Sequence, residues 1–144
     1  MISSEMNFLV DLLHNGGYTL VIEHGDEVRT FSQRGVADLM DLLEKDPAFL
    51  QGAWIADKVV GKAAAALMIK GGVVRLHTDT LSQPAFDLFD KDGSIQVECD
   101  QLVPYIENRK KDGWCPLEKL SFDKDSVEEI FLSVRDFVER MRHP

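Results

Sequence analysis

Two lysines, Lys58 and Lys62, stand where an apolar strand should give way to an alanine-rich helix. Residues four apart share one face of a helix. The amino end of a helix carries a partial positive charge, so two cations there are unfavourable unless an anion offsets them. Together with the free amides of the helix end, the two lysines would hold a phosphate or a carboxylate.

The residues around these lysines suit the same purpose. Asp57 would cap the helix by accepting amide hydrogen bonds, and it would orient a lysine or act as a base. Gly61 would allow the close approach of a ligand or of another backbone segment. The alternative is that Asp57 is only a cap and that Lys58 and Lys62 both extend into solvent.

A second stretch whose residues could take part in catalysis or ligand binding is GWCPLEK, which contains Cys115. Proline favours the first position of a helix, which leaves Cys115 at the cap, where the positive helix end lowers a thiol pKa. Glu118 would lie in the same turn. If the lysines, Asn108 or Arg109 lie nearby, Cys115 would be a thiolate nucleophile or would contact a ligand. Otherwise it is an inert, half-buried cysteine.

Known metal and phosphate-loop patterns do not occur. Histidines stand near aspartates in HGDEVR and HTD, but no second ligand pair has zinc spacing, and the two cysteines are 16 positions apart. A phosphate loop would need Gly at 56 and Ser or Thr at 63, and both positions are alanine. The sequence therefore predicts no cofactor and no metal, with carboxylate ligands such as Asp57 and Glu118 as the remaining alternative.

Size and charge narrow the class of protein. A chain of 144 residues suits one domain over 1–144. A formal net charge of -9 disfavours binding to a nucleic acid polymer or an anionic membrane. The amino terminus has no basic residue before its apolar residues, and the longest apolar run, 63–69, is too short to span a membrane. With only two cysteines, these features favour a cytoplasmic protein.

Apolar spacing predicts the elements that would position these groups. They are, in order, a helix from Ser3 or Ser4, a hairpin YTLVIEHGDEVRTF, a helix GVADLMDLLEKDP, a strand AWIAD, a helix from about Lys58 to Lys70, a strand VVRLHT, a helix around QPAFDLFDKDG and a strand IQVEC. This alternation is typical of an α/β fold with parallel strands. Ligands usually bind beyond the carboxyl ends of such strands, which here selects 57–58, 78–80 and 99–100.

The sequence predicts an added helix in the last part of the chain, at about 125–142. Ser126 and Glu129 form a capping box, and an apolar stripe follows. The stripe should pack on the domain, and contact between two copies in a homodimer is the alternative.

Two longer blocks, GAWIADKVVGKAAAALMI and LVPYIENRKKDGWCPLE, carry a resemblance. They resemble a small bacterial family of uncharacterised proteins, domain-of-unknown-function family 1893, whose fold is similar to that of cytidine deaminase. The resemblance covers about Tyr18 to Glu118 and leaves the last helix outside. It implies a three-layer α/β/α sandwich with a five-stranded mixed sheet in the order 2-1-3-4-5. The residues that it carries over are Asp57, Lys58, Gly61 and Lys62 in the first block and Asn108, Arg109, Gly113, Cys115, Pro116 and Glu118 in the second.

The chain departs from true deaminases in its metal motifs. A zinc deaminase needs H-x-E or C-x-E and then P-C-x-x-C, and neither motif is present. Zinc-dependent deamination is therefore not expected. The resemblance implies instead a pocket in which Asp57, Lys58 and Lys62 take the place of the metal ligands, with Cys115 and Glu118 closing over it.

The leading hypothesis is a binder of a small anionic, nucleotide-like ligand, with metal-independent catalysis as an extension. The expected ligand contacts are Lys58, Gly61, Lys62, Asn108 and Arg109, and the expected catalytic residues are Asp57, Lys58, Cys115 and Glu118. The alternative is a non-catalytic interaction or dimerisation module, in which these blocks maintain packing and a contact surface.

Overall fold

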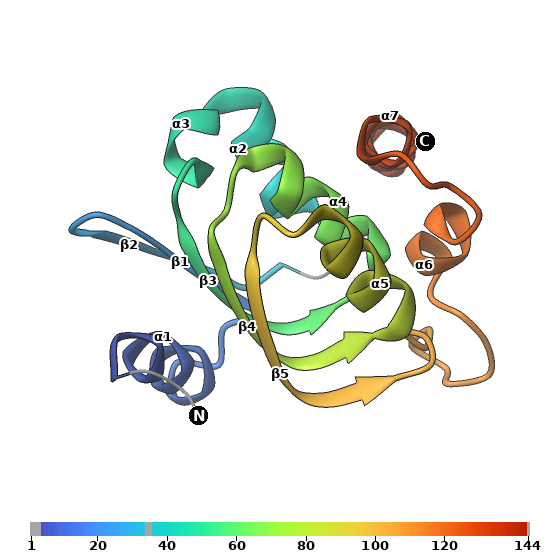
Figure 1. Cartoon of the computed structure of the whole chain (residues 1–144). Coiled ribbons are helices and arrows are strands. Elements are labelled where there is room, and N and C mark those ends of the chain that lie inside the picture. Colours follow the sequence, from blue (N-terminus) through green and yellow to red (C-terminus); the bar gives the residue numbers. More distant parts are fainter. Residues whose placement is uncertain (1–3, 34–35, 144) are drawn as a thin grey trace.

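A five-stranded mixed sheet organises the computed structural model, which describes residues 4–33 and 36–143 (Figure 1). The strand order is β2-β1-β3-β4-β5, which confirms the predicted order. Strands β3, β4 and β5 are parallel, and β1 is antiparallel to both of its neighbours. The strands are β1 (Leu20–His24), β2 (Glu27–Phe31), β3 (Trp54–Val60), β4 (Arg75–Ser82) and β5 (Gln96–Val103).

Helices lie on both faces of the sheet, so the predicted α/β class is confirmed (Figure 1). They are α1 (Ser4–Asn15), α2 (Ala37–Lys45), α3 (Pro47–Leu50), α4 (Lys62–Gly71), α5 (Gln83–Asp92), α6 (Pro116–Ser121) and α7 (Val127–Arg142). Helix α1 lies alone on one face, against β1 and β3, while α4 and α5 lie on the other. Ser3, the other predicted start of the first helix, lies outside the described residues.

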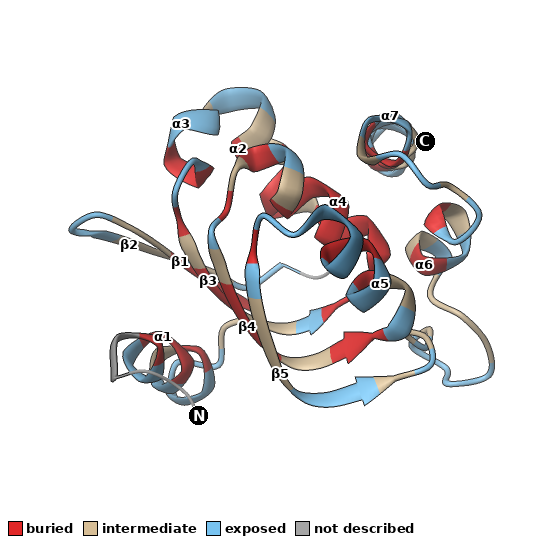
Figure 2. Ribbon diagram, in the orientation of Figure 1, coloured by how far each residue is buried: buried red, intermediate tan, exposed pale blue. Residues whose placement is uncertain are grey.

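Two apolar clusters fill the space on either side of the sheet. The main core includes the alanines at 63–66 of α4, which are all buried (Figure 2). Their small side chains allow the helix to pack closely against its neighbours. A smaller cluster joins α1 to Val21 of β1 and Ala56 of β3. No helix in the described ranges is both long and apolar enough to cross a membrane.

The parallel strands extend further than their sequence pattern predicts. Strand β3 continues to Val60 and not to Asp57, and β4 and β5 likewise end at Ser82 and Val103. In the extension of β3, Val59 pairs with Thr80 of β4, so each strand supports the next. The β-branched side chains in this stretch also fit a pleated sheet well.

This extension corrects the expected start of the following helix. Gly61 is the amino-terminal cap residue, and α4 begins at Lys62. Asp57 and Lys58 belong to β3, so Asp57 caps no helix, and Lys58 does not share a helix face with Lys62. The residues at 57–58, 78–80 and 99–100 therefore lie within strands, and the real carboxyl ends are three or four positions further on.

The last helix packs within the chain. The Ser126 hydroxyl accepts a hydrogen bond from the backbone N–H of Glu129 at 3.1 Å, which confirms the predicted cap. The apolar stripe, which includes Ile130 and Val134, is buried in the main core and contacts α4. Packing on the domain, the first of the two predicted roles of the stripe, is therefore observed.

The close packing of α4 makes a prediction for stability. Ala65→Leu adds volume at a fully buried position, and we expect it to lower the free energy of unfolding by about 1–3 kcal/mol. Glu139→Leu, on an exposed site of α7, should stay within about 0.5 kcal/mol of the parent protein. Urea denaturation measures both values, and equal effects of the two variants would show that α4 is loosely packed.

Candidate functional site

The amino end of α4 already holds an anion, the carboxylate of Glu118. The backbone N–H of Lys62 donates to Oε1 of Glu118 at 2.9 Å, and that of Ile106 donates to Oε2 at 2.9 Å. Glu118 is only 1% exposed. Hydrogen bonds from backbone amides to a carboxylate are charge-assisted and strong, and the positive helix end favours the negative charge. The anion expected at this helix end is therefore supplied by the chain itself.

Gly61 makes room for this carboxylate. A Cβ atom at Gly61 would lie 3.2 Å from Oε1 of Glu118 and 3.2 Å from a side-chain carbon of Ile106. Both contacts are tighter than most Cβ contacts in proteins, so a larger residue would require the side chain of Glu118 or of Ile106 to shift. The sequence predicts a close approach at this glycine, and the group that approaches is Glu118.

Lys62 is buried beside this carboxylate but is not paired with it. The residue is 8% exposed, and Nζ donates to the backbone oxygen of Phe122 at 3.0 Å. Within the described part of the chain, no carboxylate oxygen lies within 4.0 Å of Nζ. An ammonium group offers three donors, so two remain available.

Lys62 lines a pocket of about 330 Å³. The pocket is placed at the carboxyl ends of the parallel strands, because Lys62, Gln83 and Pro104 come directly or almost directly after β3, β4 and β5. Its other lining residues are Pro84, Asp87, Leu88, Lys91, Phe122 and Asp125. This is the position where open α/β sheets usually bind ligands. A pocket therefore lies at the edge of the sheet that the sequence predicts, but its lining residues differ from the predicted ones because the strands end further along the chain.

Asp57 belongs to β3, the central strand, which lies between β1 and β4. It pairs with Leu20 on one side and with Thr78 on the other. Burial raises the pKa of Asp57 to about 7, and the negative charge of Asp79 adds to the rise, while amide hydrogen bonds from Val59 and Lys58 oppose it. A carboxyl group of this kind titrates near neutral pH.

Lys58 follows in the same strand and is half-buried. Its backbone N–H donates to the oxygen of Thr19 at 3.2 Å. Asp57 and Lys58 both belong to β3, and the register of β3 with β4 runs from Asp57–Thr78 to Val59–Thr80 without a pair at Lys58. Neither of them lines the Lys62 pocket.

The loop before α6 holds the remaining predicted residues. Asn108 donates to Asp112 at 2.8 Å and lines a second pocket of about 590 Å³ together with Trp114. Arg109 is exposed, and Cys115 is half-buried at the cap of α6. Neither Arg109 nor Cys115 lines either of the two pockets. The structure thus brings Gly61, Lys62 and Glu118 together but leaves Cys115 and the other predicted residues outside that group.

Sequence reasoning missed the residues of α5 and of the turn after α6. Gln83, Asp87 and Lys91 line the Lys62 pocket from α5, and Phe122 lines both pockets. The signal for Gln83 was present, because it opens the helix after β4. The sequence pattern ends this strand at Thr78, whereas β4 continues to Ser82 and so places its carboxyl end next to Gln83.

The architecture defines an α/β protein with a mixed sheet, helices on both faces and a pocket beyond three parallel strands. A family model described as "Domain of unknown function (DUF1893)", with the name TM1506, matches residues 8–138, and the chain belongs to that family. The match includes most of α7, which corrects the expectation that the last helix lies outside the resemblance.

A solved structure is similar over almost the whole chain. It is the crystal structure of a DUF1893 family protein (TM1506) from Thermotoga maritima, with a TM-score of 0.85 and 23% sequence identity. The likeness covers 94% of this chain and 92% of that chain. At this identity it shows the shared fold. Comparison with curated proteins found no match.

The buried carboxylate of Glu118 should be important for stability. In Glu118→Ala the two backbone N–H groups lose their acceptor, and we expect the free energy of unfolding to fall by about 2–4 kcal/mol. Glu107→Ala, an exposed change in the same loop, is the matched control. Urea denaturation compares the two, and a Glu118→Ala variant as stable as the control would contradict this role.

Asp57 should make stability depend on pH. Its pKa is about 7 in the folded protein against an ordinary value of 3.8, so the folded state binds more protons between these values and stability falls as pH rises through this window. Asp57→Asn removes this dependence, and its stability relative to the parent protein should increase from pH 4 to pH 8. Asp136→Asn on α7 is the control. A constant difference across that range, measured by urea denaturation, would exclude the raised pKa.

Proposed function

We propose that this protein binds a small anionic ligand in the Lys62 pocket, with the ammonium group of Lys62 as the counter-charge. The observation that supports this proposal is the buried position of Lys62, which has one carbonyl acceptor and no carboxylate partner among the described residues. A buried charge is unfavourable unless it is paired and hydrogen-bonded. A bound anion would supply both the charge and the acceptors.

The lining suits a ligand that carries donor groups as well as an anionic group. Lys91 and Gln83 add donors to the pocket, while Asp87 and Asp125 add acceptors. A volume of about 330 Å³ lies at the lower end of the roughly 300–1,000 Å³ common for small-molecule sites. A nucleotide or a sugar phosphate of modest size has this chemistry.

Binding is better supported than catalysis. The expected catalytic residues, Asp57, Lys58, Cys115 and Glu118, do not line the pocket, and a catalytic group must come within reach of the reacting atoms. Glu118 already accepts from the first amide of α4, so the ligand would contact the lysine side chain and not that amide. The likeness to cytidine deaminase and the cytoplasmic location stay predictions from the sequence.

An interaction or dimerisation module is the second candidate. Phe122 is 54% exposed and contacts Trp114 edge-on, and Trp114 stacks on Tyr105 with ring centroids 4.8 Å apart. Partly exposed aromatic groups of this kind are common at protein interfaces. Trp114 and Phe122 line the second pocket, and Phe122 also lines the Lys62 pocket.

Thermal denaturation with added ligands tests the first proposal. We expect at least one compound in a panel of inorganic phosphate, nucleoside monophosphates, sugar phosphates and dicarboxylates to raise the Tm, because a ligand that binds only the folded state stabilises it. Lys62→Met keeps much of the side-chain volume but removes the charge, and the rise in Tm should disappear.

Lys119→Met is the matched control, because Lys119 lines the second pocket and not the first. It should retain the response of the parent protein. A panel without any stabilising compound, or a response that Lys62→Met retains, would overturn the proposal. A response lost only in Lys119→Met would move the site to the aromatic pocket.

A further inference from the structure

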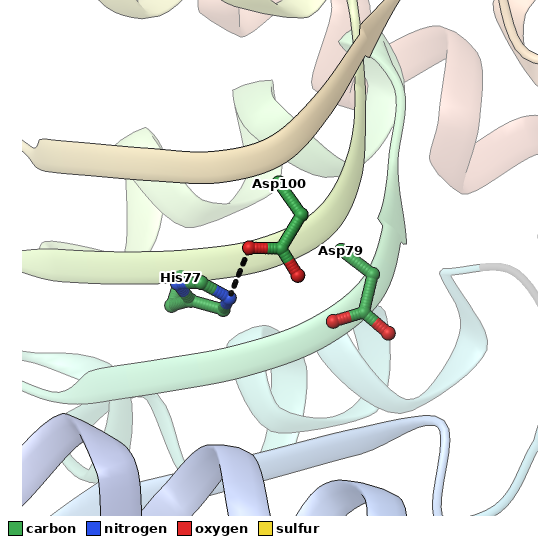
Figure 3. A group of neighbouring side chains, drawn as sticks. All are labelled: His77, Asp79 and Asp100. Carbon is green, nitrogen blue, oxygen red and sulfur yellow. Dashed lines mark ion pairs between the residues drawn. The ribbon is translucent and has the colours of Figure 1, made fainter. Parts of the chain in front are cut away.

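Three potential metal ligands meet on the face of the sheet that carries α1. They are His77 and Asp79 of β4 and Asp100 of β5, and one donor atom from each lies within 4.8 Å of the others (Figure 3). Asp79 and His77 share a face because they are two residues apart in a strand. The register of Thr78 with Cys99 places Asp79 beside Asp100. The cluster thus comes from the pairing of two strands.

This face of the sheet is covered over only part of its width. Helix α1 packs on β1 and β3, and Ala56 of β3, the register partner of His77, lies in the apolar cluster beneath it. Strand β5 lies beyond this helix, and its second half is exposed from Asp100 to Leu102 (Figure 2). His77 is therefore buried at the border of the covered region, while Asp100 reaches solvent.

His77 is buried without a hydrogen-bond partner. It is 1% exposed, and neither ring nitrogen makes a hydrogen bond within the described residues. Nε2 lies 3.6 Å from Oδ1 of Asp100, and Nδ1 lies 3.5 Å from Oε1 of Glu98, an atom that also has no hydrogen-bond partner. These distances exceed those of good hydrogen bonds. Because buried polar groups are almost always satisfied, an imidazole in this position needs another partner.

The two aspartates differ in how firmly their carboxylate groups are held. Nε2 of His14, at the end of α1, lies 2.8 Å and 3.0 Å from the two carboxylate oxygens of Asp79 and so holds that group in place. Asp100 is 60% exposed at its side chain and has only the long contact to His77. A fixed carboxylate and a movable one face the same imidazole.

We propose that His77, Asp79 and Asp100 bind a divalent first-row transition-metal ion of the Mn²⁺, Fe²⁺ or Zn²⁺ class. One imidazole nitrogen and two carboxylates suit these ions, whereas Ca²⁺ and Mg²⁺ prefer oxygen ligands alone. Nε2 of His77 would coordinate the metal, and its Nδ1–H would donate to Glu98, which is the usual outer partner of a metal-bound histidine. His14 would orient Asp79 in the same way.

The geometry requires only a small adjustment. Ligands about 2.1 Å from one ion lie at most ~4.2 Å apart, and the donor atoms already lie within 4.8 Å of one another, so at most a small closure is needed. Asp100 can supply this movement because its side chain is exposed. Arg75 lies on the same face of β4, but its guanidinium group stacks over the ring of Trp54 in a cation–π contact. The cluster carries a net negative charge, which comes from Glu98, Asp79 and Asp100.

This site is independent of the Lys62 pocket, because it lies on the other face of the sheet and shares no residue with it. The sequence prediction of no metal considered only ligand spacing along the chain. The spacing of 77, 79 and 100 resembles no zinc motif, since the third ligand is brought in by strand pairing.

Metal titration of the chelator-treated full chain tests the proposal. Calorimetry with MnCl₂ and, separately, ZnCl₂ should show one equivalent bound per chain. Asp100→Asn should weaken that binding at least ~10-fold, since even an outer-sphere change has effects of this size. Asp90→Asn, on an exposed site of α5, is the matched control and should bind as the parent protein does.

The imidazole of His77 gives a second readout that needs no buried substitution. In the parent protein, Zn²⁺ should move the ¹⁵N resonance of Nε2 of His77 and leave that of His143 in place. Absence of binding, equal affinity in Asp100→Asn and the parent, or an unchanged His77 signal at saturating Zn²⁺ would each overturn the proposal. The last of these results would identify His77 as part of an ion-pair cluster with Glu98 and Asp100.

Discussion

The carboxylate of Glu118 is shared between two backbone amides, one at the start of α4 and one in the long loop after β5. It satisfies one of the orphan donors that every helix end presents, the amide of Lys62, from 56 residues away along the chain. Because the group is buried and charged, its two acceptor atoms must stay matched to these donors. The positions of α6 and of the loop before it follow from this constraint.

The same contact determines the surroundings of Lys62. With α6 held against the end of α4, the carbonyl of Phe122 comes within reach of Nζ, and Phe122 closes one side of the pocket. The lysine is then surrounded by protein while its charge has no anionic partner in the described chain. The contact that places the carboxylate of Glu118 at the start of α4 therefore also leaves the charge of Lys62 buried without an anionic partner among the described residues.

The two faces of the sheet have separate chemistry. On one face, the alanines of α4 permit a tight core, and the pocket lies where that core ends at the carboxyl ends of the strands. On the other face, α1 packs mainly on β1 and β3, and polar side chains of β4 and β5 lie at its border. The alternation of strand residues assigns His77 to this second face, while its neighbour Leu76 enters the main core.

The order and type of most elements follow from the sequence, because helix and strand periodicities are local properties of the chain. The sequence also indicated the family as DUF1893 and named Gly61, Lys62 and Glu118 among its candidate site residues. Only the tertiary structure decided where β3, β4 and β5 end, since their last residues are stabilised by pairing with one another. For the same reason it alone joined Glu118 to α4, separated Asp57 from Lys62, and set His77 beside Asp100. These are contacts between distant segments, and no local pattern of residues specifies them.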